Sequence, residues 1–291
     1  MDFKHLHTFL TLAEIKNFTK TASVLHYAQS NVTTQIKQLE TELEVPLFHR
    51  IGKTVSLTVE GEKLVPFAKQ ILSLSNDVIS TINPNITHPI TIGASESICI
   101  SYLPGILHSF HDAYPEIVVK LKVLDTTDFY PALTNHEIDL AVCMGNRFTQ
   151  SQFLVLKEKP ESIGCFALPM HPLAKKTKVS ASDFEMESFL LTGTGCYYRK
   201  LFEQEMCQQS ITITPILETG SIQIIKESLL CGLGISVLPD CVLSKELKDG
   251  RIQKLDYETH YPVYTSLVCH KDLHRSKELD AFLLLAQDFI C

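Results

Sequence analysis

The sequence has 291 residues, of which 45% are hydrophobic and 20% are charged, and it contains only 12 glycines and 13 prolines. This composition excludes a disordered or fibrous chain, and the length is too great for one small domain. The formal net charge of -7 argues against a protein that binds polyanions over its whole surface, but it does not decide the charge of a single module.

Localisation and redox state can be predicted from simple features of the chain. It has no apolar run of the ~18 to 20 residues that a membrane helix needs, and its start lacks the cationic and apolar regions of a signal peptide. The nine cysteines form no Cys-x-x-Cys pair. We therefore expect a cytoplasmic protein that does not associate with membranes and carries reduced thiols.

Residues 1–58 show helical periodicity in three short segments. In the third segment, Val32, Ile36, Leu39 and Leu43 fall within one narrow sector, which must be buried. The opposite sector is polar and has few carboxylates; it consists of Ser30, Thr33, Thr34, Lys37, Gln38 and Thr41. Two short strands around a Gly-Lys turn follow Pro46. Three helices followed by a small hairpin are typical of a winged helix-turn-helix domain.

Residues 59–82 predict one long helix. Its apolar residues alternate steps of three and four, as in a seam between two helices: Leu64, Phe67, Ile71, Leu74 and Val78. Pro84 disfavours helix at Asn83 and ends the segment. We expect residues 59–87 to form a linker and dimerisation helix with a hinge.

From residue 88 the pattern changes to alternating strands and helices. Strands are expected at 89–94, 117–124, 139–144, 164–168, 212–217, 234–239 and 264–270, and helices at 103–113, 130–136, 197–209, 223–231 and 276–289. Repeated strand-helix-strand units predict mostly parallel sheets. We expect an effector-binding domain over 88–291, with lobe I at about 88–161 and 265–291, lobe II at about 162–264, and a cleft between them.

Spaced motifs in the first 61 residues resemble those of the LysR-type transcriptional regulators. They are Leu6-x2-Phe9, Asn17-Phe18-Thr19, Ala22-x2-Leu25, Gln29-Ser30-x-Val32-Thr33, Gln35-Ile36-x2-Leu39-Glu40, Leu43-x-Val45-x-Leu47-Phe48-x-Arg50 and Leu57-Thr58-x2-Gly61. Weaker matches follow at Leu103-Pro104, Tyr114-Pro115, Asp139-Leu140-Ala141 and Gly232-Leu233-Gly234-Ile235-x2-Leu238-Pro239. The chain departs from the family at Thr21, Thr33 and Thr34, where Ala, Ser and Arg are usual.

The resemblance implies a transcription factor rather than an enzyme. The implied fold is α+β and multidomain, with an N-terminal winged helix-turn-helix, a long linker helix and a two-lobed α/β effector domain like a periplasmic binding protein. The implied partners are double-stranded promoter DNA, a second copy or three further copies of the chain, and a small-molecule effector held between the lobes. No cofactor is implied.

The polar face of the third helix is the candidate DNA surface, because a helix in the major groove reads base edges with its side chains. Gln29 can bond adenine or guanine, and Thr33 can offer a hydroxyl or methyl contact. The full set of candidates is Gln29, Ser30, Thr33, Thr34, Gln35, Lys37, Gln38, Arg50 and Lys53. A solvated surface is the alternative for the polar strip, and a hydrogen bond that pins the wing is the alternative for Arg50.

Some effector-binding candidates follow the ends of expected strands, where open α/β sheets bind ligands, and the others lie in a loop rich in glycine and threonine that opens a helix of the second lobe. They are Ser95, Ser97, Thr126, Arg147, Thr192, Thr194 and Arg199. Hydroxyls and backbone N–H groups suit an anion, and an arginine fork would meet a carboxylate, so a small organic acid is the leading effector class. Aromatic carboxylates and amino acids stay open as alternatives. Capping or turn bonds for the hydroxyl residues, and surface salt bridges for both arginines, are the alternatives.

Three other functions are weighed against this one. Cys196 opens an expected helix, with Cys207 as a possible resolving partner, which would suit a thiol-based redox sensor. An enzyme on the two-lobed fold would need clustered acid-base groups, and a solute receptor would need an export signal. The pairs His108-x2-His111 and His270-x3-His274 lack further ligands, so no metal site is expected.

Overall fold

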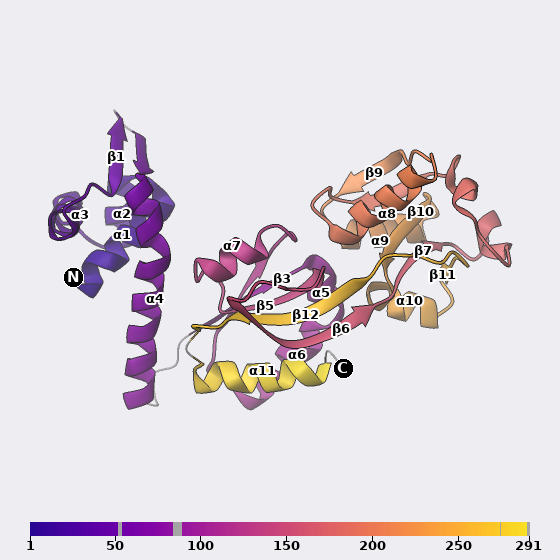
Figure 1. Cartoon of the computed structure of the whole chain (residues 1–291). Coiled ribbons are helices and arrows are strands. Elements are labelled where there is room, and N and C mark those ends of the chain that lie inside the picture. The colour runs from indigo at the N-terminus through magenta and orange to yellow at the C-terminus, as the bar shows by residue number, and fades with distance from the viewer. Residues whose placement is uncertain (52–53, 84–88, 274, 290–291) are drawn as a thin grey trace. The chain divides into compact units, whose positions relative to one another are not determined.

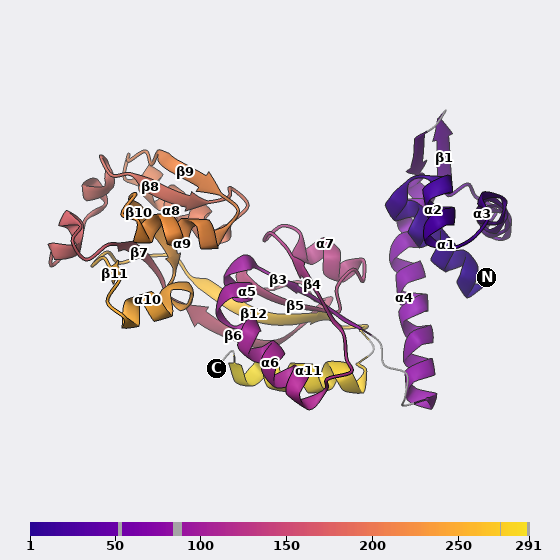
Figure 2. The same ribbon diagram turned by 180° about the vertical axis from the view of Figure 1, so that it is seen from behind.

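The computed structural model describes residues 1–51, 54–83, 89–273 and 275–289. The chain falls into two compact units, one made mostly of residues 1–88 and the other mostly of residues 89–291. We call the first unit the head and the second the sensor. The fold has the expected α+β class, with a helix-turn-helix head and a two-lobed α/β sensor (Figures 1 and 2).

The head contains α1 (Phe3–Ile15), α2 (Phe18–Val24), α3 (Gln29–Leu43), β1 (Phe48–Ile51), β2 (Thr54–Leu57) and α4 (Val59–Ile82). Helices α1 and α2 begin at side-chain caps, since Asp2 accepts from the N–H of Lys4 and Asn17 from that of Lys20. The core packs α1, α3, the hairpin and α4 together around Phe9, Ile36 and Phe48. Strands β1 and β2 pair antiparallel, as a wing requires.

The Leu-Thr-x2-Gly motif has a structural reason at the start of α4. Thr58 donates its hydroxyl to the carbonyl of Pro46 at 2.8 Å and accepts from the N–H of Gly61 at 2.9 Å. A Cβ at Gly61 would lie 2.3 Å from the carbonyl oxygen of Leu47, so only glycine fits without a backbone shift. The motif therefore locks the hairpin to the linker helix.

Helix α4 uses its apolar residues in two ways. Leu64 and Ile71 pack against the core of the head. Phe67, Leu74 and Val78 are 62%, 54% and 50% exposed. The expected seam is thus divided between the head's own core and an uncovered apolar face.

Lobe I of the sensor is built on a sheet with the order β4-β3-β5-β12-β6. Its strands are β3 (Ile90–Ala94), β4 (Val119–Val123), β5 (Leu140–Gly145), β6 (Phe153–Glu161) and β12 (Val263–His270), and its helices are α5 (Glu96–Ser101), α6 (Leu103–Ala113), α7 (Phe129–Thr134) and α11 (Lys277–Phe289). Strand β3 runs parallel to β4 and β5, whereas β12 is antiparallel to β5 and β6. Alternate residues of β5 face opposite layers: Leu140 and Val142 join the core under α6 and α11, while Ala141 and Cys143 join the one under α7 (Figure 1).

Lobe II has the sheet order β11-β7-β10-β8-β9. Its strands are β7 (Ile163–Ala167), β8 (Phe189–Thr192), β9 (Pro215–Thr219), β10 (Ile235–Pro239) and β11 (Gln253–Lys254), and its helices are α8 (Tyr197–Gln208), α9 (Ile222–Leu230) and α10 (Ser244–Lys248), with short 3-10 turns at Pro172–Lys175, Ala181–Phe184 and Asp240–Leu243. Strand β8 runs parallel to β9 and β10. The long strands β6 and β12 lie side by side where the chain passes between the lobes (Figure 2).

Five strands and helices of the sensor are missing from the sequence-based expectation, namely β6, β8, β11, α5 and α10, and so are the short 3-10 turns. Helix α7 ends at Thr134 rather than at residue 136. The other expected strands and helices are present, with ends shifted by a few residues. Strand β6 mixes apolar residues with the charged run Lys157-Glu158-Lys159, and its strand conformation follows from pairing with β12, far along the chain.

Candidate functional site

The polar face of α3 is the candidate nucleic-acid surface of the head. The helix buries Val32, Ile36 and Leu39. On its remaining surface the exposed candidates are Gln29, Ser30, Thr34, Lys37 and Gln38, and Thr33 is half-buried. The amphipathic pattern expected from the sequence is therefore present. It leaves a strip of amide and hydroxyl side chains, together with Lys37, accessible to solvent.

The start of α3 connects to α2 through side chains. Gln29 accepts from the hydroxyl of Thr19 at 3.1 Å, and Thr33 donates to the backbone carbonyl of Gln29 at 3.0 Å. A glutamine side chain has two donor hydrogens and two acceptor lone pairs, so one bond to Thr19 leaves most of its capacity for another partner. The bond to Thr19 therefore positions the Gln29 side chain and leaves its remaining donors and acceptor available for another partner.

Gln35 lies on a different side of α3 from the other candidates. It is half-buried and accepts from the hydroxyl of Thr8, a fully buried residue of α1, at 2.6 Å. Its carboxamide oxygen therefore fastens α1 to α3. Of the two wing candidates, Arg50 lies in β1 and Lys53 lies outside the described residues.

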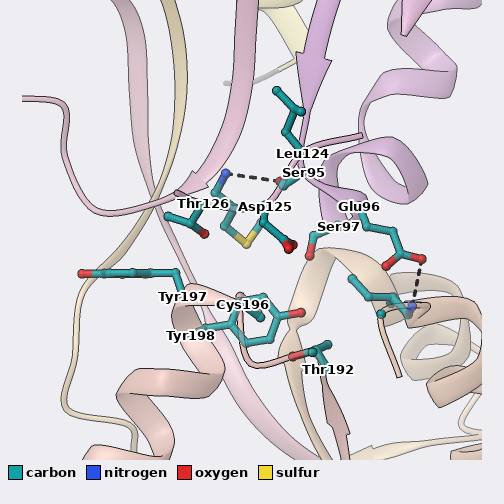
Figure 3. Close-up of a pocket in the computed structure, with 14 residues that line it drawn as sticks. Ser95, Glu96, Ser97, Leu124, Asp125, Thr126, Thr192, Cys196, Tyr197 and Tyr198 are labelled. Atoms are coloured by element: carbon teal, nitrogen blue, oxygen red, sulfur yellow. Dashed lines mark hydrogen bonds between the residues drawn. The ribbon is translucent and has the colours of Figure 1, made fainter. Parts of the chain in front are cut away.

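The sensor contains a cavity of about 110 Å³ between its lobes (Figure 3). The carboxyl ends of β3, β4 and β5 line it from lobe I, and the ends of β8 and β9 with the starts of α8 and α9 line it from lobe II. The lining residues are Ser95, Glu96, Ser97, Leu124, Asp125, Thr126, Met144, Thr192, Gly193, Cys196, Tyr197, Tyr198, Gly220 and Ile222. The cavity thus occupies the position at which open α/β sheets bind ligands.

The wall from lobe I is held by hydrogen bonds to backbone N–H groups. Ser95 follows β3 and accepts from the N–H of Met144 at 3.3 Å, and Ser97, two residues further on, is buried. Glu96 reaches across to lobe II, where its Oε1 accepts from the N–H of Ile222 at 2.9 Å (Figure 3). Burial raises the pKa of the Glu96 carboxyl, against the lowering effect of the bond to Ile222, and nearby Asp125 raises it further.

The wall from lobe II holds two buried hydroxyls that lack a hydrogen bond of normal geometry. Thr192 and Tyr198 are 5% and 3% exposed, and neither hydroxyl makes such a bond among the described residues, although the two lie close to each other, to Ser97 and to Cys196. Buried hydroxyls are rarely left unpaired, because desolvation without a hydrogen bond costs about 1–3 kcal/mol. Both groups line the cavity, so a ligand with matching polar atoms would satisfy them.

Four of the seven predicted effector residues line this cavity, namely Ser95, Ser97, Thr126 and Thr192. Thr194 is exposed and lies outside the lining set. The sequence-based candidates left out four lining residues with strong chemistry: Glu96, Asp125, Tyr197 and Tyr198. Their signal was their position beside the chosen hydroxyl residues, at the ends of β3 and β4 and the start of α8.

Both arginines chosen as ligand clamps belong to other interactions. Arg199 is 4% exposed and bonds the carbonyl of Thr192, Glu203 at 3.0 Å and Glu218 at 3.0 Å. Arg147 is exposed, pairs with Glu158 at 2.9 Å and lies 4.3 Å from the ring centre of Tyr264. Neither lines the cavity, so the expected cationic clamp is absent from the described lining.

The cysteine chemistry does not favour the redox alternative. Burial raises the pKa of the Cys196 thiol, which lowers the fraction of reactive thiolate. Cys196 precedes α8 and Cys207 lies near its end, so the helix holds the two about 16 Å apart, against the ~6 Å between Cα atoms of a disulfide. Among the described residues, no group of three His, Cys, Asp or Glu side chains could hold a metal ion, and no described helix is long and apolar enough to cross a membrane.

Comparisons with known proteins agree with this architecture. Residues 3–62 match the model of the bacterial regulatory helix-turn-helix proteins of the lysR family, and residues 85–290 match the LysR substrate binding domain. The uncharacterised HTH-type transcriptional regulator YwqM of Bacillus subtilis (strain 168) is 35% identical over 290 residues, covering 99% of each chain. GltR of the same organism is 28% identical over 99% of this chain and 97% of its own.

Solved structures show the same fold at lower identity. A full-length OxyR variant from Pseudomonas aeruginosa has a TM-score of 0.74 at 22% identity, over 99% of this chain and 95% of its own. ArgP from Mycobacterium tuberculosis has a TM-score of 0.74 at 17% identity, over 100% and 97%. At these sequence identities, the similarity between the structures shows a shared fold and nothing about function.

Proposed function

The chain belongs to the LysR family of DNA-binding transcriptional regulators, and from this premise we propose that its oligomer binds promoter DNA and responds to a small effector in the cavity between the sensor lobes. In this proposal, residues 1–58 bind DNA, residues 59–87 link and dimerise, and residues 88–291 bind the effector. The protein acts as a switch rather than an enzyme, and its named relatives are regulators.

The DNA-binding part of the proposed function rests on the surface of α3. Its uncharged strip offers amide and hydroxyl groups, the side chains that read base edges in the major groove. Gln29 and Thr33 lie at the start of the helix, the part that contacts bases in helix-turn-helix proteins. Ser30, Thr34, Lys37, Gln38 and Arg50 are proposed to contact the backbone or more distant bases.

The oligomer part is supported by the uncovered apolar face of α4. Phe67, Leu74 and Val78 recur at steps of seven and four, and all three are at least half exposed. Such a face is typical of a helix that pairs with a second helix. We propose that two copies of α4 pair through it, which presents two heads to two half-sites of DNA.

The experiment is a fluorescence anisotropy titration of the full chain with the DNA upstream of its own gene, over a series of salt concentrations. The expected result is sequence-selective binding. The logarithm of the affinity should fall linearly with the logarithm of the salt concentration. The double variant Gln29→Ala with Thr33→Ala should lose about 1–3 kcal/mol of discrimination between this DNA and scrambled DNA.

Thr41→Ala serves as the matched control, because Thr41 is exposed on the same helix but donates to the carbonyl of Lys37 near the helix end. It should bind like the parent protein. Equal affinity of the parent for specific and scrambled DNA would contradict the proposal. So would a double variant that keeps full selectivity, because α3 would then not be the element that reads the sequence.

A further inference from the structure

The cavity of the sensor has an unusual charge for a site expected to bind an organic acid. Its charged lining residues are Glu96 and Asp125, and none of the described residues that line it carries a positive charge. The two arginines nearest in sequence are engaged elsewhere, Arg199 with Glu203 and Glu218 and Arg147 with Glu158. A carboxylate ligand would meet two like charges and no cation.

The helix starts of lobe II do not compensate for this charge, because the protein's own carboxylates already lie there. The starts of α8 and α9 line the cavity, and a helix start attracts anions. Glu96 accepts from the first N–H of α9 at 2.9 Å. Asp125 lies against Gly195, just before α8, where an added Cβ would come within 2.7 Å of its Oδ2. Both helix starts that lobe II offers to an anionic ligand are therefore taken.

The unpartnered hydroxyls of Thr192 and Tyr198 supply a second, independent sign of a ligand. Both side chains are more than nine-tenths buried, and both line the same cavity as the two carboxylates (Figure 3). A hydroxyl oxygen can accept from an ammonium group, and an aromatic ring attracts a cation over its face. Tyr197 and Tyr198 provide two such rings in the lining.

We propose that the effector is a small ligand with a protonated amine, whose ammonium group binds Asp125 and Glu96 and is further satisfied by the hydroxyls of Thr192 and Tyr198. This inference rests on the proposed function, since it names the chemical class of the effector in the same cavity. A volume of about 110 Å³ restricts the ligand to a small metabolite, because cavities for drug-sized ligands have ~300–1,000 Å³.

The same geometry couples the ligand to the arrangement of the lobes. Glu96 belongs to α5 of lobe I, and its bond to Ile222 is a direct polar link to α9 of lobe II. Glu96 and Asp125 both belong to lobe I, whereas Thr192 and Tyr198 belong to lobe II, so a cation bound by all four groups would hold the two lobes together. A ligand shifts the equilibrium between two arrangements of the lobes only through its difference in affinity for them.

The test measures binding to the full chain by calorimetry and thermal shift with a matched four-carbon series: 1,4-diaminobutane, 4-aminobutanoate, butanedioate and 1,4-butanediol. One or both of the amines should bind and raise the melting temperature, with an affinity at least about tenfold above that of the dicarboxylate and the diol. Binding of the diamine alone indicates a free amine as effector, whereas binding of the amino acid indicates a zwitterion. Both results support the proposal.

Variants assign the effect to the carboxylates. Asp125→Asn and Glu96→Gln should each weaken amine binding by about tenfold or more, and Gln at position 96 can still accept from Ile222. Asp128→Asn is the control, since Asp128 is exposed near Asp125 but outside the lining. Asp125→Lys should reverse the preference toward butanedioate.

Preferential binding of butanedioate by the parent protein, or no binding of either amine, overturns the inference. Unchanged amine affinity in both Asp125→Asn and Glu96→Gln also overturns it. These failures are distinct from failure of the proposed function, because selective DNA binding is measured separately and survives a wrong assignment of the effector class. Loss of DNA selectivity with intact amine binding would refute the function of the head alone.

Discussion

The head and the sensor present their candidate sites in opposite ways. In the head, the site is the exposed face of one helix, and every candidate on α3 comes from within ten consecutive residues. In the sensor, the site is an enclosed cavity whose walls come from the ends of five strands in two lobes. A site on one helix depends on local periodicity, whereas the charge of the cavity depends on partners that are distant along the chain.

The largest expected effect separates the two units. Phe9 is fully buried in the head and lies 5.5 Å from Phe48 between ring centres. Phe9→Ala should cost about 3–5 kcal/mol of unfolding free energy, which a domain of this size cannot sustain. DNA binding should be lost while the thermal transition of the sensor and its response to an effector persist.

Phe3→Ala is the control for this prediction, because Phe3 lies on the same helix and is 53% exposed. It should leave DNA binding and both unfolding transitions near those of the parent protein. If Phe9→Ala also removed the transition of the sensor, the two units would fold as one, and the comparison between them would fail.

The next effect concerns the buried arginine of lobe II. Arg199→Met should lower the stability of the sensor by about 2–3 kcal/mol, because it removes three hydrogen bonds and leaves the carbonyl of Thr192 unsatisfied. The loss is limited because Glu203 and Glu218 are 36% and 44% exposed and stay partly hydrated. Urea unfolding of the full chain measures it.

Arg147→Met provides the matched comparison at the surface. Its pair with Glu158 is exposed on the arginine side, and such pairs contribute about 0–1 kcal/mol. If Arg199→Met unfolded like the parent but abolished effector binding, Arg199 would be a ligand clamp after all. Arg199 would then be the cation that binds a carboxylate, and the organic-acid hypothesis would be favoured again.

These arginines show where sequence-based prediction succeeded and where it did not. The burial of Val32, Ile36 and Leu39 was predictable because helical spacing alone places them on one face, and that face determines which polar residues of α3 are exposed. Arg199 follows a loop rich in glycine and threonine, which favours a binding role. Its partner Glu203, four residues along the helix, was a visible sign of a structural role, but Glu218 on β9 was not.

The fold of the sensor was predictable to a similar extent. Strands β3, β5 and β10 are apolar except for Thr91 and Ser236, so their burial could be read from composition. Strand β8 is a run of only four residues, too short to distinguish from a buried turn, and it becomes a strand by lying between β9 and β10. The acidic character of the cavity likewise emerges only when the neighbouring strands β3 and β4 bring Glu96 and Asp125 into the same lining.

Cysteine reactivity offers a test of smaller magnitude. All nine cysteines lie in the sensor region of the sequence, so an oxidant would act there and not on the head. Burial raises the pKa of Cys196, and Cys207 is exposed. At neutral pH an alkylating reagent should modify Cys207 at least about tenfold faster than Cys196 in the folded protein, as followed by peptide mass spectrometry.

The reverse order of labelling would contradict this prediction, since it would show Cys196 to be an accessible thiolate. Labelling in denaturant is the control, and it should make the two rates similar. A fast Cys196 in the folded protein would revive the redox alternative and weaken the case for an amine effector.

The smallest expected effect is the dependence of stability on pH through Glu96. Its folded-state pKa lies above the ordinary value of 4.5, chiefly because burial disfavours the charged form. Between 4.5 and the folded-state pKa, the folded protein keeps a proton that the unfolded chain has lost. The free energy of unfolding therefore falls as pH rises through this window, and the cost of ionisation is fully present above it.

Glu96→Gln removes that cost and can keep an acceptor for Ile222. Relative to the parent protein, the variant should gain stability as pH rises through the window, whereas Glu116→Gln at an exposed site is the control. A parent protein that gains stability relative to Glu96→Gln over the same window would mean that the carboxylate's bond to α9 outweighs its burial. The two lobes would then be held together by Glu96 without any ligand, and an amine would have no penalty to relieve.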